Sequence, residues 1–561
     1  MQNLTPKPHR FIGFNILNKS ALKKSCLLLF GLITTPAFCA VEMPAVIGSH
    51  MVLQSGEPVN FWGWADAGEK IEIKQDGKTL ATATGAGKET PWRVKLPPLK
   101  AGPVADIEIV GTTTISLTDI LAGEVWLCSG QSNMQMTMEK GPWCGWSEGV
   151  VDHATEVAAA KDPQIRAFLD EGNGKPTPQS RPKGQWVVCS PETAPKFSAT
   201  AYYLAQSLRS ELKTPVGILI SSVGGTHAEL WTPKRVLDTD PAFDNARTKA
   251  KKTTDELGPL ATEDQQTNAA WKKAVEEAKK NNITPPEKPT FKLTQEQSYN
   301  YSDARALLNT SELYNGKIFP LAPYNIKGAL WYQGENNARV ADRYAQLMTD
   351  LITGWREDWG KPFPFIMVGL ASYSDKKAAW NPLVGSWALI REAQIKVAQT
   401  LPQTGVILAT DITPASPSQS CSIHPINKKP VGQRAALWAL EHVYGKPVIS
   451  AGPVFGKVMF ASGKARVEIP PSPSSAGLTL KSPGGFELAA GDKKFIPATA
   501  TLINGAIEVS ADGITDPVAL RYGFVNWPEL TVFNAHGLPA FPFRTDQWEI
   551  IPADRDPIKP E

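Results

Sequence analysis

Three stretches with different patterns of hydrophobic and polar residues follow one another along the chain. Residues 41 to about 118 form short runs rich in β-branched and aromatic residues, separated by Gly, Asp and Pro clusters. From Gly123 to Tyr444, apolar runs of strand length alternate with amphipathic helical runs. From about Ser450 to Ala540, short β-rich runs and Gly-containing turns return. This order predicts an α/β domain between two β-rich segments.

The middle stretch predicts a parallel sheet with helices on both faces, a three-layer α/β/α arrangement. Its expected strands are Glu124–Cys128, Val216–Ser222, Gly328–Tyr332, Phe363–Val368 and Gly405–Asp411. Its expected helices are Tyr202–Leu212, Ala338–Trp359, Leu389–Thr400 and Val431–Tyr444. Residues about 245–300, rich in Lys, Glu, Gln and Thr, interrupt the alternation and predict a helical insertion on the surface. The predicted segments are a β-sandwich segment at 41–118, an α/β domain at 119–448 and a second β-sandwich segment at 449–561.

The first forty residues have the pattern of a secretory signal. They contain five basic residues and no Asp or Glu, followed by an apolar run at Cys26–Ile33 and small residues up to Ala40. The apolar run is too short to cross a bilayer, whereas a basic start, a short apolar core and a small-residue end are typical of a cleaved signal. We therefore predict that residues 1–40 direct export to the periplasm or the extracellular space.

Removal of this segment changes the charge balance and excludes some classes of partner. The full chain has 58 basic and 55 acidic residues, so 53 basic and 55 acidic residues would remain, a net charge of −2. No basic stripe indicates a nucleic-acid partner, and no later segment is apolar enough to span a membrane. Four cysteines remain, which allow three pairings in an oxidising compartment: Cys128, Cys144, Cys189 and Cys421. No Cys or His spacing indicates a metal site.

The stretch GEVWLCSGQSNM, residues 123–134, contains the strongest candidate for chemistry. It places Ser132 just past the carboxyl end of an expected buried strand, where a helix would begin. Ligands of open α/β sheets bind in the crevice outside the carboxyl ends of the strands, and the first amides of a helix can hold a developing oxyanion. Ser132 is therefore a candidate nucleophile, although a serine at this place can also simply cap a helix.

Polar residues also follow the other expected strands. Gly224 and Gly225 follow the second strand, Gln333–Asn336 the third and Asp411 the last, with His424 beyond it. Each of these residues alone has a structural explanation, as a turn, a cap or a core side chain. Because parallel strands end at the same edge of a sheet, we expect the group together to form one active site.

The chemistry of esters assigns roles within this group. Ser132 would attack an ester carbonyl, and His424 would take its proton and return it to the departing alcohol. A carboxylate would orient the imidazole of His424. The backbone amides of Ser132 and Gly224, with the side chain of Gln333, would hold the oxyanion.

Several blocks of the sequence resemble one known family of enzymes. GQSNM at 130–134, SSVGGT at 221–226, WYQGENNA at 331–338 and SIHPINK at 422–428 resemble the sialate O-acetylesterases and the related acetylxylan esterases, a branch of the SGNH-type hydrolases. GSHMVLQSGEPVNFWGWADAGEKI at 48–71 and LYNGKIFPLAPYNIKGALWYQGE at 313–335 are also similar to that family. The blocks occur in the same order and cover most of the mature chain.

The resemblance implies an SGNH-like α/β/α hydrolase domain flanked by β-sandwich, jelly-roll-like segments. It implies a serine esterase that removes acetyl groups from sugar or polysaccharide hydroxyls without a cofactor. By this resemblance Ser132 is the nucleophile, His424 the base, and Gly224 and Gln333 are oxyanion donors. The same blocks supply three further candidate substrate-binding residues: Gln131, Asn133 and Asn336.

The resemblance leaves the acid of the site open. Many SGNH relatives place an Asp two or three residues before the catalytic His, but these positions here are Ser422 and Cys421. Asp411 lies thirteen residues before His424, and Glu335 corresponds to the acid of some relatives. A backbone carbonyl that orients His424 is a third possibility.

Two substrates and two other functions remain open at this point. A sialate esterase needs a cation for the sugar carboxylate, for which Arg339 and Arg391 are candidates, and an acetylxylan esterase would favour an aromatic groove. The aromatic candidates are Trp143, Trp146, Trp231 and Trp380. A lipase or thioesterase of the same fold would need an apolar acyl pocket, and the glycine-rich, polar loops favour it less. A glycan-binding protein with a degenerate hydrolase core is the alternative from another class, and the intact Ser132 and His424 disfavour it.

Overall fold

The structure is a computed structural model that describes residues 40–141, 149–373, 385–412 and 423–550. The described residues from Ala40 onward belong to one compact unit. The predicted signal segment, apart from its last residue, therefore lies outside the described residues.

A mostly parallel sheet forms the centre of the described chain, as predicted. Its order is β11-β10-β12-β9-β13-β14-β15, and every neighbouring pair is parallel except β10 with β11. The strands are β9 (Ile120–Gly130), β10 (Ile165–Asp170), β11 (Gly184–Val188), β12 (Val216–Ser222), β13 (Gly328–Tyr332), β14 (Phe365–Gly369) and β15 (Thr404–Leu408). Strands β10 and β11 were not predicted, because both carry polar residues among the apolar ones.

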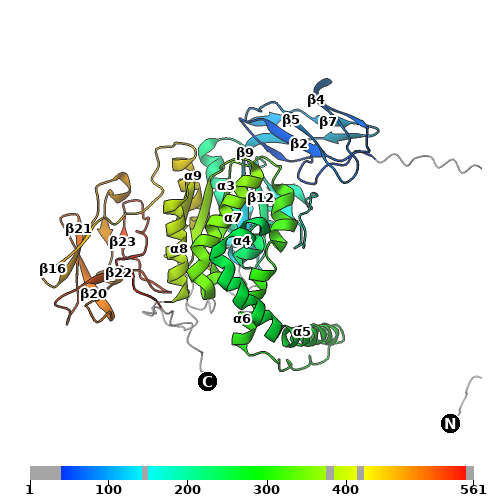
Figure 1. The fold of residues 1–561 in the computed structure, drawn as a ribbon. Helices are drawn as coiled ribbons and strands as arrows, with labels where there is room; N and C mark the ends of the chain where they lie inside the picture. Colours follow the sequence, from blue (N-terminus) through cyan, green and yellow to red (C-terminus); the bar gives the residue numbers. More distant parts are fainter. Residues whose placement is uncertain (1–39, 142–148, 374–384, 413–422, 551–561) are drawn as a thin grey trace, which may run out of the picture. The chain divides into compact units, whose positions relative to one another are not determined.

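Helices cover both faces of this sheet (Figure 1). They are α3 (Ala199–Leu212), α7 (Tyr344–Trp359), α8 (Ser386–Thr400) and α9 (Lys429–His442). Successive side chains of a strand point to opposite faces, and β9 shows this alternation. Its Val125 and Leu127 share a buried core with α7 and α8, whereas Trp126 and Cys128 share another with α3 and α9.

The N-terminal β-rich segment is joined to the central sheet by backbone pairing. Its strands are β1 (Val52–Gln54), β2 (Val59–Gly63), β3 (Lys70–Gln75), β4 (Lys78–Thr84), β5 (Trp92–Leu96), β6 (Gly102–Val104), β7 (Ile107–Val110) and β8 (Thr114–Leu117). Strands β4-β3-β7-β8 form one antiparallel sheet and β2 pairs with β5. Strands β1 and β6 pair with the first residues of β9. The eleven-residue β9 thus belongs to both structures.

The C-terminal β-rich segment forms an antiparallel sheet with a core of its own. Its strands are β16 (Val458–Ala461), β17 (Lys464–Glu468), β18 (Thr479–Leu480), β19 (Phe486–Ala489), β20 (Phe495–Ile503), β21 (Ala506–Ser510), β22 (Ala519–Tyr522), β23 (Val532–Phe533) and β24 (Phe543–Arg544). The main sheet has the order β16-β17-β21-β20-β19-β22-β24, and β18 pairs with β23. Phe486, Leu488, Ile507 and Tyr522 are among its buried residues.

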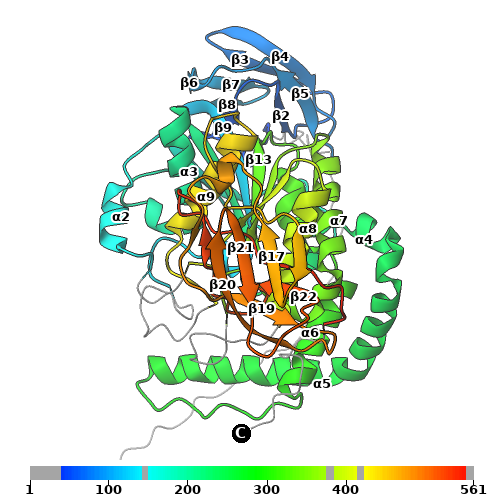
Figure 2. The ribbon, with the colours of Figure 1, turned by 90° about the vertical axis from the view of Figure 1, so that its left-hand side faces the viewer.

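The predicted helical insertion is present as two helices, α5 (Asp244–Lys280) and α6 (Gln295–Leu308), which α4 (Lys234–Thr239) precedes. Helix α5 is the long helix that Figure 2 shows along its full length, and Ala250 and Ala278 are its buried residues. The described residues also contain two further short α-helices, α1 (Ser132–Gln135) and α2 (His153–Ala159).

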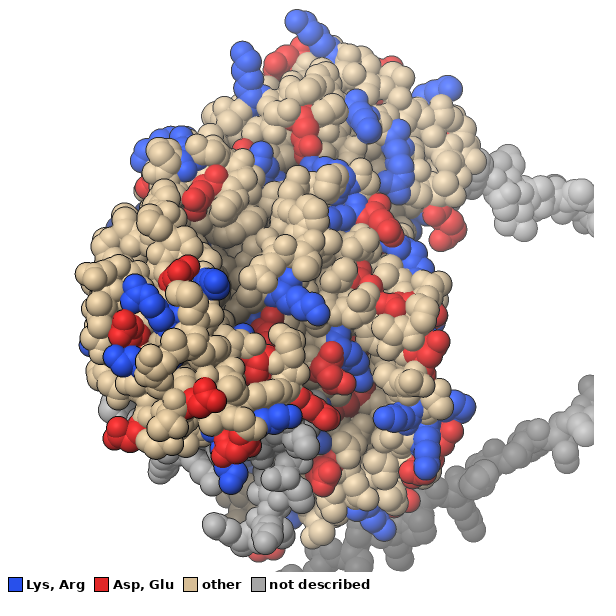
Figure 3. Space-filling view, turned by 60° about the vertical axis from the view of Figure 1, so that its left-hand side comes forward, with Lys and Arg blue, Asp and Glu red and all other residues tan. Residues whose placement is uncertain are grey.

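The described surface carries charges of both signs. Lys and Arg are interspersed with Asp and Glu over the face shown in Figure 3. Among the helices of the described residues, none combines the length and the hydropathy that crossing a bilayer requires.

Candidate active site

Ser132 lies where β9 ends and α1 begins. Gly130, the last residue of β9, has φ +136°, and a Cβ on it would lie 2.1 Å from the carbonyl oxygen of Tyr332 in β13. A glycine is therefore required where β9 and β13 approach so closely. The amide of Gln131 donates to the same carbonyl oxygen over 2.9 Å. Ser132 follows as the first residue of α1 and is 5% exposed.

The structure brings Ser132 and His424 together across 292 residues of sequence. Nε2 of His424 lies 2.9 Å from Oγ of Ser132, a hydrogen-bond distance. His424 precedes α9, on the segment that follows β15. These are the two residues for which the sequence predicts the roles of nucleophile and base, and a serine and a histidine in this contact can carry out acyl transfer.

Asn133 connects Ser132, its own neighbour, to the segment that carries the histidine. Its Nδ2 donates to the carbonyl oxygen of Ile423, the residue before His424, over 2.9 Å. The same nitrogen donates to Oε1 of Glu335 over 2.6 Å, and Nζ of Lys428 donates to Oδ1 of Asn133. The side-chain amide of Asn133 is therefore bonded on both sides, which fixes its orientation.

Lys428 and Glu335 are both buried in this group. Burial lowers the pKa of Lys428 to about 7, and the nearby Glu335 only partly opposes that shift. Burial raises the pKa of Glu335, although its hydrogen bonds and Lys428 act in the other direction. The sequence reasoning did not single out Lys428, even though it is the last residue of the SIHPINK block.

The two carboxylates proposed from the sequence have other partners. Arg434 binds both oxygens of Asp411, at 2.6 and 2.7 Å. Glu335 accepts from Asn133. Within the described ranges, neither carboxylate forms a hydrogen bond or an ion pair with His424. Ser422 and Cys421, the two positions before His424 where many relatives have an acid, lie outside the described residues.

Gln333 does not have the free side-chain amide that an oxyanion donor needs. Its Nε2 donates to the carbonyl oxygen of Thr226 over 3.0 Å and to Oδ1 of Asn337 over 2.7 Å. Its Oε1 accepts from the hydroxyl of Tyr344 over 2.9 Å. Because both amide hydrogens are used and the residue is fully buried, Gln333 holds the loop after β13 in place. An oxyanion role for its side chain, as the resemblance implies, would require one of these two Nε2 bonds to be released.

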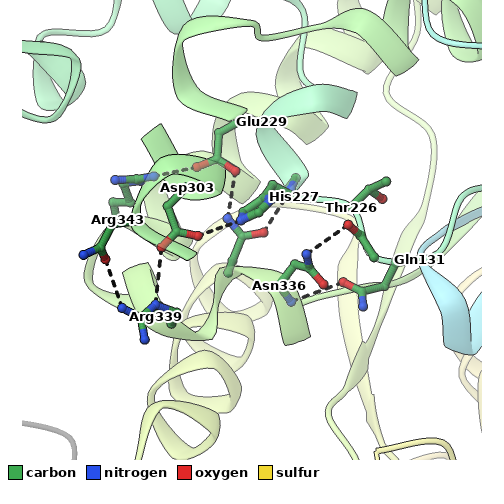
Figure 4. A network of polar contacts seen from close by, with 12 residues as sticks. Gln131, Thr226, His227, Glu229, Asp303, Asn336, Arg339 and Arg343 are labelled. Carbon is green, nitrogen blue, oxygen red and sulfur yellow. Dashed lines mark hydrogen bonds and ion pairs between the residues drawn. The ribbon is translucent and has the colours of Figure 1, made fainter. Parts of the chain in front are cut away.

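The other candidate oxyanion donors differ in whether their N–H groups already have a hydrogen-bond acceptor. The amide of Gly224 donates to Oε1 of Gln135 over 2.6 Å. The amide of Asn336 lies 3.4 Å from Oε1 of Gln131, and Nδ2 of Asn336 donates to the carbonyl oxygen of Gly225 over 3.0 Å (Figure 4). In the described part of the chain, the amide of Ser132 has no protein acceptor.

A polar network continues from Asn336 toward helix α6 (Figure 4). Nε2 of His227 lies 2.8 Å from Oδ1 of Asp303, and Nε of Arg339 lies 3.6 Å from Oδ2 of the same carboxylate. Glu229 accepts from Arg343 over 2.9 Å and from Asn337 over 2.8 Å. The sequence reasoning missed Glu229, His227 and Asp303, because their partners are distant in the chain.

The remaining candidates from the sequence divide into core residues and residues outside the described ranges. Arg391 is buried and donates to the carbonyl oxygens of Leu370 and Val525, so it is not placed to bind substrate. Trp231 is buried in the core. Outside the described residues lie Trp143, Trp146, Trp380, Cys144 and Cys421. Cys128 and Cys189 are buried free thiols. Across the described residues, no three His, Cys, Asp or Glu side chains gather as metal ligands.

Comparison with known proteins agrees with this geometry. Residues 295–434 match the family model of the carbohydrate esterases described as sialic acid-specific acetylesterases. The chain is 26% identical to the sialate O-acetylesterases of mouse, over 92% of this chain and 96% of that protein, and of human, over 89% and 91%. A crystal structure of a carbohydrate acetylesterase from Xanthomonas citri matches with a TM-score of 0.70 and 30% identity, over 91% of this chain and all of that one.

The chain belongs to the carbohydrate acetylesterase family. It is a carbohydrate O-acetylesterase, a carboxylic ester hydrolase. The first and last matched residues of the family model, 295 and 434, fall in α6 and α9, so the matched stretch includes Gln333, Glu335 and His424.

We expect the Glu229 network to give this esterase an acid-sensitive stability. Burial alone would raise the pKa of Glu229, but Arg343, His227 and Asn337 together hold it below the usual value. A carboxyl with a lowered pKa stabilises the fold above its unfolded pKa of about 4.3, and this contribution disappears as the pH falls through the folded pKa. The Glu229→Gln variant should therefore lose about 2 kcal/mol of unfolding free energy at pH 7 and progressively less below pH 4.

Urea denaturation at a series of pH values measures this difference. Glu357→Gln is the matched control, because Glu357 pairs with Arg235 at the surface and is 56% exposed. An exposed ion pair contributes about 1 kcal/mol or less to the free energy of unfolding. A constant difference between wild type and Glu229→Gln from pH 7 to pH 3 would contradict the assignment.

Proposed function

We propose that Ser132 and His424 remove acetyl groups from sugar hydroxyls through an acetyl-enzyme. The contact of 2.9 Å between Nε2 of His424 and Oγ of Ser132 carries this proposal. Oγ attacks the acetyl carbonyl carbon while Nε2 accepts the hydroxyl proton, and the protonated imidazole then gives that proton to the departing sugar oxygen. Water attacks the acetyl-serine with His424 again as base, which releases acetate and restores Ser132.

The oxyanion of each tetrahedral intermediate needs donors close to Ser132. The backbone amide of Ser132, the first residue of α1, is one such donor. Each well-placed oxyanion donor lowers the activation barrier by roughly 3 kcal/mol. The amide of Gly224 serves as a second donor once Oε1 of Gln135 releases it. Gln131, Asn133 and Asn336 then act by holding the loops around the nucleophile rather than by touching the reacting carbonyl.

We infer that Glu335 acts through Asn133 and not directly on the histidine. Oε1 of Glu335 holds Nδ2 of Asn133, which in turn holds the carbonyl oxygen of Ile423. Glu335→Gln keeps an oxygen for this bond and should lower kcat less than about tenfold. Glu335→Ala removes it and should lower kcat by roughly 30-fold, because small displacements of catalytic groups are costly.

Steady-state kinetics of both variants across pH distinguishes this arrangement from a direct acid. If Glu335 supported the imidazolium itself, the glutamine variant would lose roughly 10⁴-fold in kcat, as when a triad carboxylate becomes an amide. Asp411→Asn is the matched control, because Asp411 is held by Arg434.

We propose further that the α/β part is an SGNH-type three-layer hydrolase domain at residues 119–448. The helices on both faces of the parallel sheet support this, as does the position of Ser132 at a strand end. The β-rich segments at 41–118 and 449–561 would be jelly-roll-like additions to it. The sequence of residues 1–40 supports export, to the periplasm or the extracellular space.

For the substrate we propose O-acetylated sialic acid, with acetylated xylan as the alternative. The match to the sialic acid-specific model and the mouse and human relatives supports the first. Arg339, about a third exposed and linked through Asp303 to the loop after β12, is the cation best placed for a sugar carboxylate.

Acetate release from both substrates, combined with labelling by a fluorophosphonate, tests this proposal. Acetate release together with phosphonylation at Ser132, located by peptide mass spectrometry, supports the serine mechanism, and the faster substrate identifies the class. An intact protein that binds glycans but neither reacts with the fluorophosphonate nor releases acetate would be a binding protein instead.

A further inference from the structure

A cleft separate from Ser132 opens between the helical insertion and the loop after β12. Its volume is about 1180 Å³, and its walls come from α5, α6, the connection between these two helices and the loop that begins at Gly225. The residues that matter for its chemistry are Gln265, Asn268, Phe291, Tyr299, Tyr301 and Arg305. None of them was assigned a role in ester hydrolysis.

Hydrogen bonds link the rim of this cleft to the nucleophile. Gly225 lines the cleft, and its carbonyl oxygen accepts from Nδ2 of Asn336 over 3.0 Å. The amide of Asn336 in turn lies 3.4 Å from the side chain of Gln131, the residue before Ser132 (Figure 4). Ser132 and the rim of the cleft are therefore joined by a short chain of contacts through Gln131 and Asn336.

The insertion is also attached to the segment that follows β13. Asp303 of α6 pairs with His227 at 2.8 Å and with Arg339 at 3.6 Å. Arg339 further donates to Oδ1 of Asn300 over 3.0 Å, and its guanidinium lies 5.3 Å from the centre of the Tyr299 ring. These contacts hold α6, and the aromatic ring on it, in a fixed position beside the catalytic loops.

The side chains of the cleft suit a sugar ring. Tyr299 is 47% exposed, Phe291 and Tyr301 are partly exposed, and all three line the cleft. Arg339 lies over one face of the Tyr299 ring and Lys288 over one face of the Phe291 ring, which leaves the other face of each for a sugar. The side-chain amides of Gln265 and Asn268 and the guanidinium of Arg305 supply donors and acceptors for hydroxyl groups. Aromatic faces combined with a few polar groups are typical of a site for an amphipathic small ligand.

We propose that this cleft is a second sugar subsite, which binds a glycosyl unit of the same glycan beyond the acetylated one. The proposal rests on the proposed function, because the acetyl group of the same molecule must lie at Ser132. The enzyme would then select acetylated oligosaccharides over acetylated monosaccharides, and the insertion between β12 and β13 would determine chain-length preference.

The test compares an acetylated oligosaccharide with an aryl acetate, which is too small to reach the cleft. Tyr299→Ala and Asn268→Ala should each lower the ratio of kcat/KM for the oligosaccharide to kcat/KM for the aryl acetate by roughly tenfold, mainly through KM. Tyr299→Phe, which keeps the ring, should retain most of that ratio. Lys272→Ala is the matched control, because Lys272 is exposed on α5 but does not line the cleft.

Different results would contradict the second subsite and the serine mechanism. An unchanged ratio in both alanine variants, with the thermal unfolding of each like that of wild type, would overturn the subsite. An equal loss on both substrates would overturn it as well, since the effect would then lie at the catalytic centre. Failure of the mechanism would be visible independently, as equal activity of wild type and Ser132→Ala on the aryl acetate.

Discussion

Replacement of Ser132 by alanine is expected to lower kcat for acetate release by roughly 10⁴-fold or more. The variant lacks the oxygen that forms the acetyl-enzyme, the Oγ that lies 2.9 Å from Nε2 of His424. Because Ser132 is almost fully buried and alanine is smaller, the fold should remain intact. Acetate release at saturating substrate measures kcat, and circular dichroism confirms folding.

Two further variants make this result specific. His424→Ala should lower kcat about as much as Ser132→Ala does. The double variant should have a kcat no lower than that of either single variant, because the two residues act as a unit. Ser129→Ala is the matched control, since its Oγ is buried in β9 and has no hydrogen-bond partner in the described residues. Additive losses in the double variant would contradict the shared role.

Replacement of Lys317 by methionine is expected to lower the unfolding free energy by about 3–5 kcal/mol. Lys317 lies in a π-helical turn, Tyr314–Ile318, and its Nζ is 2.8 Å from Oδ2 of Asp170 at the end of β10. Both side chains are almost fully buried, at 4% and 2% exposure. Ser221 also donates to Asp170, but a hydroxyl does not neutralise the charge that the variant would leave buried.

Urea denaturation of single and double variants measures this cost. Asp170→Asn combined with Lys317→Met should recover part of the loss, because no uncompensated charge then remains buried. Lys361→Met is the matched control, since Lys361 pairs with Glu57 at 2.6 Å but both side chains are about a third exposed. That pair should contribute about 1 kcal/mol or less, and an equally large loss in both lysine variants would contradict the argument.

The sequence was sufficient for the parts of the fold that depend on local patterns. The buried strands β9, β12, β13, β14 and β15 were each expected from an apolar run, because a strand covered on both faces has few polar positions. Strands β10 and β11 were missed, since β10 contains Arg166 and Asp170, whose partners lie far away in the chain.

Some residues of the candidate site could be identified from the sequence, whereas the roles of others depend on neighbours that only the fold provides. Ser132 and His424 were identified from short motifs, and their contact follows from the shared edge of a parallel sheet. The sequence did not reveal that the side-chain amide of Gln333 is already bonded, because its partners, Thr226, Asn337 and Tyr344, meet it only in the folded chain. The acid was left open for the same reason, since Asp411 and Glu335 differ in their neighbours and not in their motifs.

The sequence by itself therefore determined the order of the segments, the parallel sheet and the serine–histidine pair, all of which follow from periodicity and short motifs. Only the tertiary structure decided which polar side chains are free and which are already bonded. Hydrogen bonds and buried ion pairs join residues that are tens to hundreds of positions apart, and burial then decides their charge. The network of Asn133, Glu335 and Lys428 and the cleft beside the insertion belong to this second class.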